Sequence, residues 1–312
     1  MNKIEYWNFS DKEIRESAVR MRELSALNYH KKVLSNDKKF KDWVYSFRYD
    51  CLRLVEKLIK KAYSGKIMEI GAGTGIYSCI LSQYPRIEKI YTLDYSEVCI
   101  KELVPFIMSR FNLSESQKNK IYRVVGSFDN IKIADNSLDF IISMGSLHHS
   151  EDREKTLREL FRVLKKGGYL IACERASNNN LTNKQLNENL NIEYSDEHKK
   201  LMGYEKESKY TRRMNSEHEP LLAEWEYLTT KVGFKSNIFW FQKFSKKSKA
   251  GPFGQIFNFF GNCFFRLFGL QLMKKRLSQI LHLKIPYYPW FSNSKPDDIL
   301  ILAKKVPYYE MP

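Results

Sequence analysis

A glycine-rich turn and an acid beyond it are suited to hold a nucleoside-containing ligand. The turn reads Glu69-Ile70-Gly71-Ala72-Gly73-Thr74-Gly75. Glycines allow the chain to turn sharply there, and they let a ligand approach the backbone with no Cβ in the way. Asp94 lies 19 residues beyond Gly75, close to the spacing at which a carboxylate binds the hydroxyls of a ribose.

Two common phosphate-binding patterns are missing from this turn. Ile76 stands where a dinucleotide-binding pattern has its third glycine, and no Gly-Lys-Ser/Thr follows. The sequence therefore excludes a P-loop and argues against an NAD-type site.

Two adjacent histidines offer proton chemistry. His148 and His149 follow a predicted strand, at the edge where open α/β sheets place ligands. Histidine titrates near neutral pH and is the usual base for a hydroxyl group. His149 is our first candidate for a base and His148 the second, but His148 also suits a purely structural role in orienting the next helix.

The elements that must position these residues alternate along the chain. Short apolar runs predict strands, and apolar residues at helical spacing predict helices between them. The predicted strands are 66–70, 89–93, 121–125, 138–144 and 169–173, with helices at 75–84, 96–110 and 151–166. This order predicts an α/β fold, a Rossmann-like and mainly parallel sheet with helices on both faces.

The rest of the chain divides into three further parts. Residues 1–64 are expected to form a helical cap, and 65–175 the ligand-binding domain. Residues 176–219 are polar, and so long a connection is usually a lid, a binding loop or disordered. Residues 220–312 would complete the fold with a helix at 220–232 and strands at 238–241 and 299–303, around an aromatic insertion at 251–290.

At this point the sequence resembles the class I S-adenosylmethionine (SAM)-dependent methyltransferases, in particular the ubiquinone/menaquinone-biosynthesis type. The matching blocks occur in the family's order and cover about 110 residues, from 66 to 175. They are residues 69–75, 92–96, 126–129, 135–141, 146–149 and 157–168. Each block alone is weak evidence, but together they are specific.

The resemblance implies SAM as the cofactor and assigns its contacts by position. Gly71, Gly73 and Gly75 would admit its methionyl and ribose parts, Glu69 would hold the methionyl amine, and Asp94 would bind the ribose hydroxyls. The adenine would lie beside Tyr95, Ser127 and Phe128, and the sulfonium beside Met144. Ser127 stands where the family often has Asp, so this chain lacks that carboxylate. Glu69 also suits a turn partner, and Phe128 a core aromatic.

The acceptor is expected under the polar segment 176–219. Tyr210, Arg212 and Arg213 are its candidate contacts, because guanidinium groups bind phosphate or carboxylate. The alternative is a solvated charged face. None of the five cysteines forms a Cys-x-x-Cys pair or lies at zinc-ligand spacing with histidine, so the sequence predicts no metal site.

A formal net charge of +16 favours anionic partners, although lysines occur throughout the chain. Residues 252–276 would form an aromatic amphipathic helix with basic flanks, which suits an anionic membrane surface. The alternative is a helix packed on the protein or on a second subunit. Apolar surroundings of the cysteines and the lack of a secretory signal predict a cytoplasmic protein. If 252–276 binds the membrane, the protein would be peripheral on its inner face.

The sequence thus predicts a SAM-dependent methyltransferase acting on a small-molecule, glycan or lipid-linked acceptor, with oxygen as the favoured atom. The first alternative is an RNA methyltransferase. Nucleic acid is not an expected partner, because the fourth strand lacks the Asn/Asp-Pro-Pro-Tyr/Phe motif of base-methylating enzymes and the sequence shows no additional RNA-binding motif. The second alternative is a non-catalytic SAM-binding protein.

Overall fold

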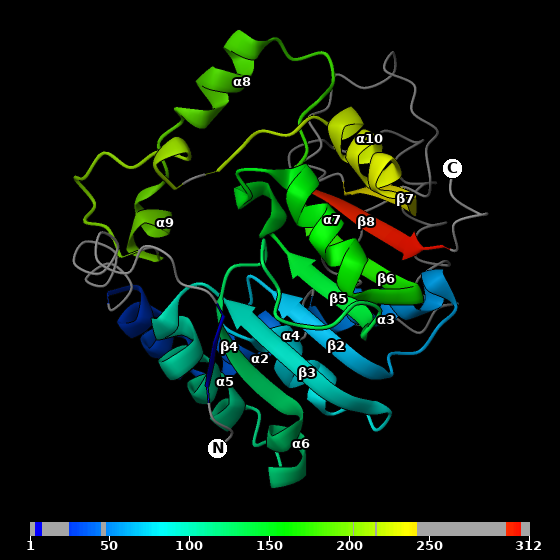
Figure 1. Ribbon diagram of the computed structural model, residues 1–312. Coiled ribbons are helices and arrows are strands. Elements are labelled where there is room, and N and C mark those ends of the chain that lie inside the picture. The colour runs from blue at the N-terminus through cyan, green and yellow to red at the C-terminus, as the bar shows by residue number, and fades with distance from the viewer. Residues whose placement is uncertain are drawn as a thin grey trace, which may run out of the picture.

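The computed structural model describes residues 4–7, 25–44, 48–201, 203–215, 217–241 and 298–306. Its centre is an eight-stranded sheet with the order β1-β4-β3-β2-β5-β6-β8-β7 (Figure 1). The strands are β1 Glu5–Trp7, β2 Gly65–Ile70, β3 Ile87–Asp94, β4 Ile121–Gly126, β5 Leu138–Met144, β6 Leu164–Glu174, β7 Phe234–Phe241 and β8 Asp298–Lys305. Strands β1 to β6 pair in parallel, and β8 is antiparallel to both of its neighbours.

The central strands are buried on both faces, which is why they are apolar without alternation. In β2, Ile67, Met68 and Ile70 are fully buried, and β5 follows the same pattern. Helices cover both faces, and this confirms the Rossmann-like α/β fold predicted from the sequence.

Each face of the sheet has its own helical layer (Figure 1). One hydrophobic core joins the sheet to the helical residues 25–34, α2 Asp37–Trp43, α3 Tyr49–Ile59, α4 Ile76–Ser82 and α5 Val104–Arg110. The other core joins it to α7 Arg153–Val163 and α10 Leu222–Val232. The short helix α6 Glu115–Lys120 leads into β4. Helices α8 Asn183–Leu190 and α9 Asp196–Leu201 lie beyond the carboxyl ends of the strands.

The N-terminal segment is not wholly helical, contrary to our expectation for residues 1–64. Residues Glu5–Trp7 form β1 beside β4, and Trp7 is 4% exposed within the second core. A three-residue strand is too short to leave a periodic signal. Pairing with a strand more than a hundred residues away fixes its conformation instead.

Two predicted helices have different ends. The helix predicted at 151–166 stops at Val163, because Leu164 is extended and residues 164–166 already belong to β6. Lys305 stabilises this end: its Nζ donates to the carbonyls of Phe161 at 2.6 Å and Leu164 at 2.8 Å. The helix predicted at 96–110 is divided into a π-helical turn, Cys99–Leu103, and α5, which has a proline in its first turn.

The C-terminal part agrees with the predicted helix and strands, with longer strands than expected. The insertion 251–290, the basic-flanked stretch 252–276 and Cys263 lie outside the described residues. Cys51, Cys79, Cys99 and Cys173 are free thiols, and the first two are buried. Within the described ranges, no helix has the length and apolar character needed to cross a membrane.

Candidate functional site

The strand order reverses between β2 and β5, and the candidate site lies at their carboxyl ends. From β2 the chain proceeds through β3 and β4 to one side, and from β5 it proceeds to β6 on the other. Ligands of open α/β sheets bind at such a switch point. Here Gly71, after β2, packs on Ser146, after β5, and a Cβ built on Gly71 would lie 2.3 Å from the Ser146 Cβ. The Ser146 hydroxyl also donates to the Ile70 carbonyl at 3.1 Å.

The glycine turn leaves open space above its backbone. Gly71 and Gly73 have φ values of +56° and +50°, which L side chains rarely adopt. A Cβ built on Gly73 would meet nothing within 4 Å. Gly75 is the N-cap of α4, and the side chain of Val104 packs against it. The turn therefore offers one uncovered stretch of backbone at the switch point, at Gly73.

Glu69 is a buried acid on β2, just before the turn. It is 3% exposed and accepts a hydrogen bond from the Ser78 backbone N–H at 2.7 Å, and a second one from the Ser78 hydroxyl. Burial raises the pKa of Glu69 to about 7, against the opposing effect of these hydrogen bonds. The carboxyl group can thus exchange a proton near neutral pH.

Asp94 connects the end of β3 to the glycine turn. One carboxylate oxygen accepts from the Gly73 N–H at 2.7 Å, and the other from the Ser96 N–H at 2.8 Å. Burial raises the pKa of Asp94, and the backbone hydrogen bonds oppose that rise. The Tyr95 N–H is a third backbone donor to this carboxylate, which leaves one of its four lone pairs for a ligand. Tyr95, beside it, is 58% exposed.

The remaining cofactor candidates flank this turn. The Ser127 hydroxyl accepts from the Asp129 N–H at 3.2 Å. Phe128 is partly buried and packs on the second core, as the core-aromatic alternative expected. Met144 ends β5 and is partly exposed at the switch point.

Glu174, the last residue of β6, organises the loop after β5 and was missed from the sequence. It is fully buried and accepts from the Ser143 hydroxyl at 2.7 Å and from the Leu147 N–H at 3.0 Å. Its other oxygen lies 2.8 Å from His148 Nδ1. Burial alone would raise the pKa of Glu174, but the hydrogen bond and charge of His148 outweigh it, so the pKa is lowered. The sequence signal that could have identified Glu174 is its position as an acid at the end of a buried apolar strand.

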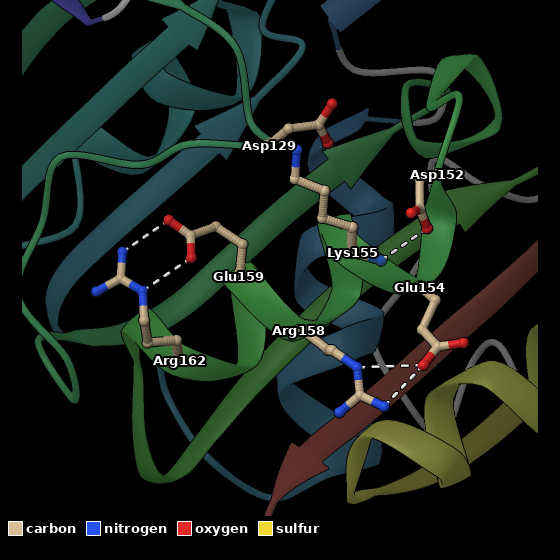
Figure 2. Close-up of a pocket in the computed structure, with 7 residues that line it drawn as sticks. All are labelled: Asp129, Asp152, Glu154, Lys155, Arg158, Glu159 and Arg162. Atoms are coloured by element: carbon tan, nitrogen blue, oxygen red, sulfur yellow. Dashed lines mark hydrogen bonds and ion pairs between the residues drawn. The ribbon is translucent and has the colours of Figure 1, made fainter.

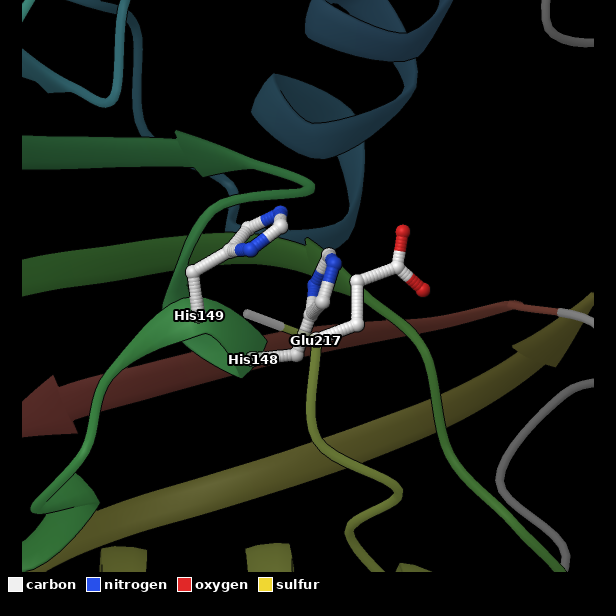
Figure 3. Close-up of side chains that lie close together, drawn as sticks. All are labelled: His148, His149 and Glu217. Carbon is white, nitrogen blue, oxygen red and sulfur yellow. The ribbon is translucent and has the colours of Figure 1, made fainter. Parts of the chain in front are cut away.

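His148 and His149 form a short 3₁₀ turn, Leu147–His149, at this edge. His148 is 4% exposed, whereas His149 is partly exposed, and their ring centroids are 4.3 Å apart. Glu217, from the end of the polar segment, lies beside them (Figure 3). One ligand-type atom from each of the three residues lies within 4.8 Å of the other two.

Glu217 is held by a cluster of charged and hydroxyl groups. Its Oε2 accepts from Arg175 at 2.5 Å and from Arg212 at 2.7 Å, and its Oε1 accepts from the Tyr194 hydroxyl. Burial raises the pKa of this acid, but Tyr194 and the two guanidinium groups outweigh burial and bring it to about 2. Glu217 is therefore an anion under the polar segment.

The three acceptor candidates from the sequence take different places. Tyr210 is 1% exposed, stacks on Tyr204, and donates to Asn215 Oδ1 at 2.5 Å. Arg212 already pairs with Glu217 and Glu219, so its contacts give no support to the predicted binding of an anionic acceptor. Arg213 points away from this cluster to amide oxygens of α8.

A separate hollow follows the outer face of α7 and is lined by seven charged residues (Figure 2). Its charges largely pair with each other, as in Arg162 with Glu159 and Arg158 with Glu154, both at 2.7 Å. The hollow therefore offers little free charge to a ligand.

Known proteins resemble the segment that contains this site. Residues 68–172 match the family described as "Methyltransferase domain". The ubiquinone/menaquinone biosynthesis C-methyltransferase UbiE of Geotalea daltonii is 31% identical over 123 residues, which are 39% of this chain and 50% of that protein. A demethylmenaquinone methyltransferase of Listeria monocytogenes is 28% identical over 124 residues, with the same shares. The chain thus spans about half the length of these curated relatives.

Solved structures agree on the fold. A putative sarcosine dimethylglycine methyltransferase from Galdieria sulphuraria aligns with a TM-score of 0.52 at 19% identity, over 83% of this chain and 85% of that one. The YcgJ protein from Bacillus subtilis aligns with a TM-score of 0.51 at 16% identity, over 82% and 98%. With the sheet order and the glycine turn, these findings show that the chain carries a class I methyltransferase domain, whose methyl donor is SAM.

Proposed function

We propose that this protein transfers the methyl group of SAM to a hydroxyl-bearing small-molecule, glycan or lipid-linked acceptor, with oxygen as the favoured atom. The observation that carries the proposal is the position of the histidine pair. His148 and His149 follow Gly145 and Ser146 at the switch point, and Ser146 packs on the cofactor turn at Gly71. Imidazole groups at this edge would lie close to the place where an acceptor meets the sulfonium.

The cofactor would lie over the glycine turn. Gly73 gives it open backbone, the carboxylate of Glu69 would pair with its ammonium group, and the remaining lone pair of Asp94 would accept from a ribose hydroxyl. The adenine would lie between the exposed ring of Tyr95 and the loop of Ser127 and Phe128. Met144 would border the sulfonium.

The chain's contribution to the chemistry would be alignment, exclusion of water and handling of one proton. In the transfer, the acceptor oxygen forms a bond to the methyl carbon while the carbon–sulfur bond breaks. Its electron pair stays on sulfur and gives S-adenosylhomocysteine. Correct alignment is worth about 7–11 kcal/mol in well-oriented systems, and the hydroxyl proton would leave at the histidine pair, where His149 is the more accessible.

The polar segment 176–219 would cover the acceptor. It is fixed near the histidines by the Arg175–Glu217 ion pair and by a hydrogen bond from the His218 N–H to the His148 carbonyl at 3.2 Å, while the Arg212–Glu217 ion pair is internal to the segment. Tyr194 and Tyr210 form part of its inner side, 5.3 Å apart between ring centroids.

A ring carbon is the second candidate acceptor. The Geotalea relative is named a C-methyltransferase of quinone biosynthesis. Removing the proton from a phenolic hydroxyl makes its oxygen and its ring carbons nucleophilic, so the same site would serve either atom. Membrane association through 252–276 would suit a lipid-linked acceptor and stays a prediction.

The test is a transfer assay with SAM carrying a ¹³C-methyl group and a panel of hydroquinones, glycans and lipid-linked phenols. NMR of the product distinguishes a methyl ether from a ring methyl group. Label in neither position, with SAM bound, would reject the proposal for these acceptor classes. Label transferred to added RNA would favour the nucleic-acid alternative.

A further inference from the structure

The cluster of His148, His149 and Glu217 has the composition of a metal site. We propose that these three side chains bind one divalent transition-metal ion, which holds the acceptor hydroxyl. The ion's role in holding the acceptor rests on the proposed function, whereas the binding of the ion to the three side chains does not. The three residues bring together two imidazole nitrogens and one carboxylate oxygen within 4.8 Å (Figure 3). The sequence predicted no metal, because Glu217 is nearly seventy residues from the histidines and gives no ligand spacing.

His148 is arranged as metal-binding histidines usually are. Its Nδ1 lies 2.8 Å from the fully buried carboxylate of Glu174. When Nδ1 donates to that carboxylate, Nε2 carries the free lone pair, and this is the atom left to bind a metal. A carboxylate behind a histidine fixes both the tautomer and the ring orientation in metal sites.

The third ligand, Glu217, is held in place by groups that support a carboxylate ligand. Arg175, Arg212 and Tyr194 hydrogen-bond to it, and ligating carboxylates are commonly hydrogen-bonded in this way. Its four lone pairs are largely engaged, with Asn215 a further donor at 3.3 Å. A metal would therefore displace the weak Asn215 bond or the Tyr194 hydroxyl from Oε1.

The charge of the surroundings permits a dication. The carboxylates of Glu217 and Glu219 pair with the guanidinium groups of Arg175 and Arg212, and that of Glu174 pairs with His148. With neutral histidines the cluster carries one net negative charge. A bound dication would reverse that charge to one positive, which a deprotonated acceptor oxygen then neutralises.

The ligand atoms need only a small closure. Atoms bound at about 2.1 Å to a tetrahedral metal are about 3.4 Å apart, against separations of up to 4.8 Å here. His149 is partly exposed, and rotation of its side chain would supply the difference.

The ligand set identifies the class of ion. Two nitrogens and one carboxylate oxygen suit zinc, cobalt, iron or manganese, whereas magnesium and calcium take oxygen ligands. Three protein ligands leave at least one position open, as catalytic sites do. An acceptor hydroxyl in that position would lose its proton more easily. With the metal bound, the ion would therefore replace the free imidazole of His149, which is the base of the proposed function in the metal-free protein.

The experiment is titration of the full-length, metal-free protein with Co²⁺, followed by its visible absorption. We expect one Co²⁺ per chain, with Zn²⁺ displacing it. Removing a direct ligand in His149→Gln should weaken binding at least about a hundredfold, and Glu174→Gln, behind His148, by about 10–100-fold. His30→Gln, in the helical residues 25–34, is the matched control and should bind as the wild type does.

Several results would overturn the metal site. These are no stoichiometric Co²⁺ in a folded wild type, or equal affinity in wild type and folded His149→Gln. Circular dichroism of each variant confirms folding, and His148→Gln gives a second loss of ligand. SAM binding is measured on the same samples. A protein that binds SAM but takes up no metal rejects this inference alone, and a protein that takes up metal but does not bind SAM rejects the proposed function alone.

Discussion

Protonation of Glu69 should control the affinity for SAM near neutral pH. Burial raises its pKa to about 7 in the ligand-free protein. The ammonium group of SAM pairs with the ionised carboxylate, so binding requires the proton to leave. Affinity must therefore rise with pH through 7 and fall below it.

The size of the effect follows from that pKa. The ionised fraction of Glu69 is about one half at pH 7 and about one eleventh at pH 6. Lowering the pH from 7 to 6 should therefore raise the Kd for SAM about fivefold. The groups facing Glu69 are Ser78 and the Asp94 carboxyl, whose pKa is also raised.

Calorimetry at both pH values, in two buffers of different ionisation enthalpy, measures affinity and released protons together. At pH 6 about 0.9 proton should leave Glu69 for each SAM bound. Glu69→Gln should bind weakly and with no pH dependence. A Kd that is constant from pH 6 to 7, or a fivefold change that survives in Glu69→Gln, would refute the reasoning.

Three further substitutions test the framework of the site. Gly71→Ala should lose stability in urea by about 1–3 kcal/mol more than Gly167→Ala, since both have positive φ but only Gly71 has a side chain, that of Ser146, within 4 Å; equal losses would argue against the close packing. Lys305→Met should cost about 1–3 kcal/mol, because it removes the Nζ donor from the carbonyls of Phe161 and Leu164 at the end of α7, and SAM affinity should not change. Glu174→Gln should cost about 1–3 kcal/mol, because an amide cannot accept from every donor around it; an unchanged urea midpoint would show that those bonds contribute little.

The parallel core of the fold was predictable because burial on both faces leaves continuous apolar runs. The bounds predicted for β5 match the structure, and those of β2 and β4 differ by one residue. Helix ends were less predictable, since Lys305, far along the chain, helps to end α7 at Val163.

The cofactor side of the site was more visible in the sequence than the acceptor side. Glycines in a turn and an acid after the next strand are local signals, and the structure joins them through the Gly73–Asp94 hydrogen bond. The cluster around Glu217 also depends on residues far apart in the chain, such as His148 and Arg175, and no pattern in the sequence indicates that Arg212 pairs with Glu217. Spacing alone cannot show which charge meets which.

The central claim is that the glycine turn and Asp94 bind SAM. Its most direct test is calorimetric titration of SAM into the wild type, Asp94→Ala and the control Asp135→Ala, whose carboxylate pairs with Arg162 on the protein surface. We predict binding by the wild type and by Asp135→Ala, and its loss in folded Asp94→Ala. A folded wild type that does not bind SAM, or Asp94→Ala that binds it equally well, would contradict the account.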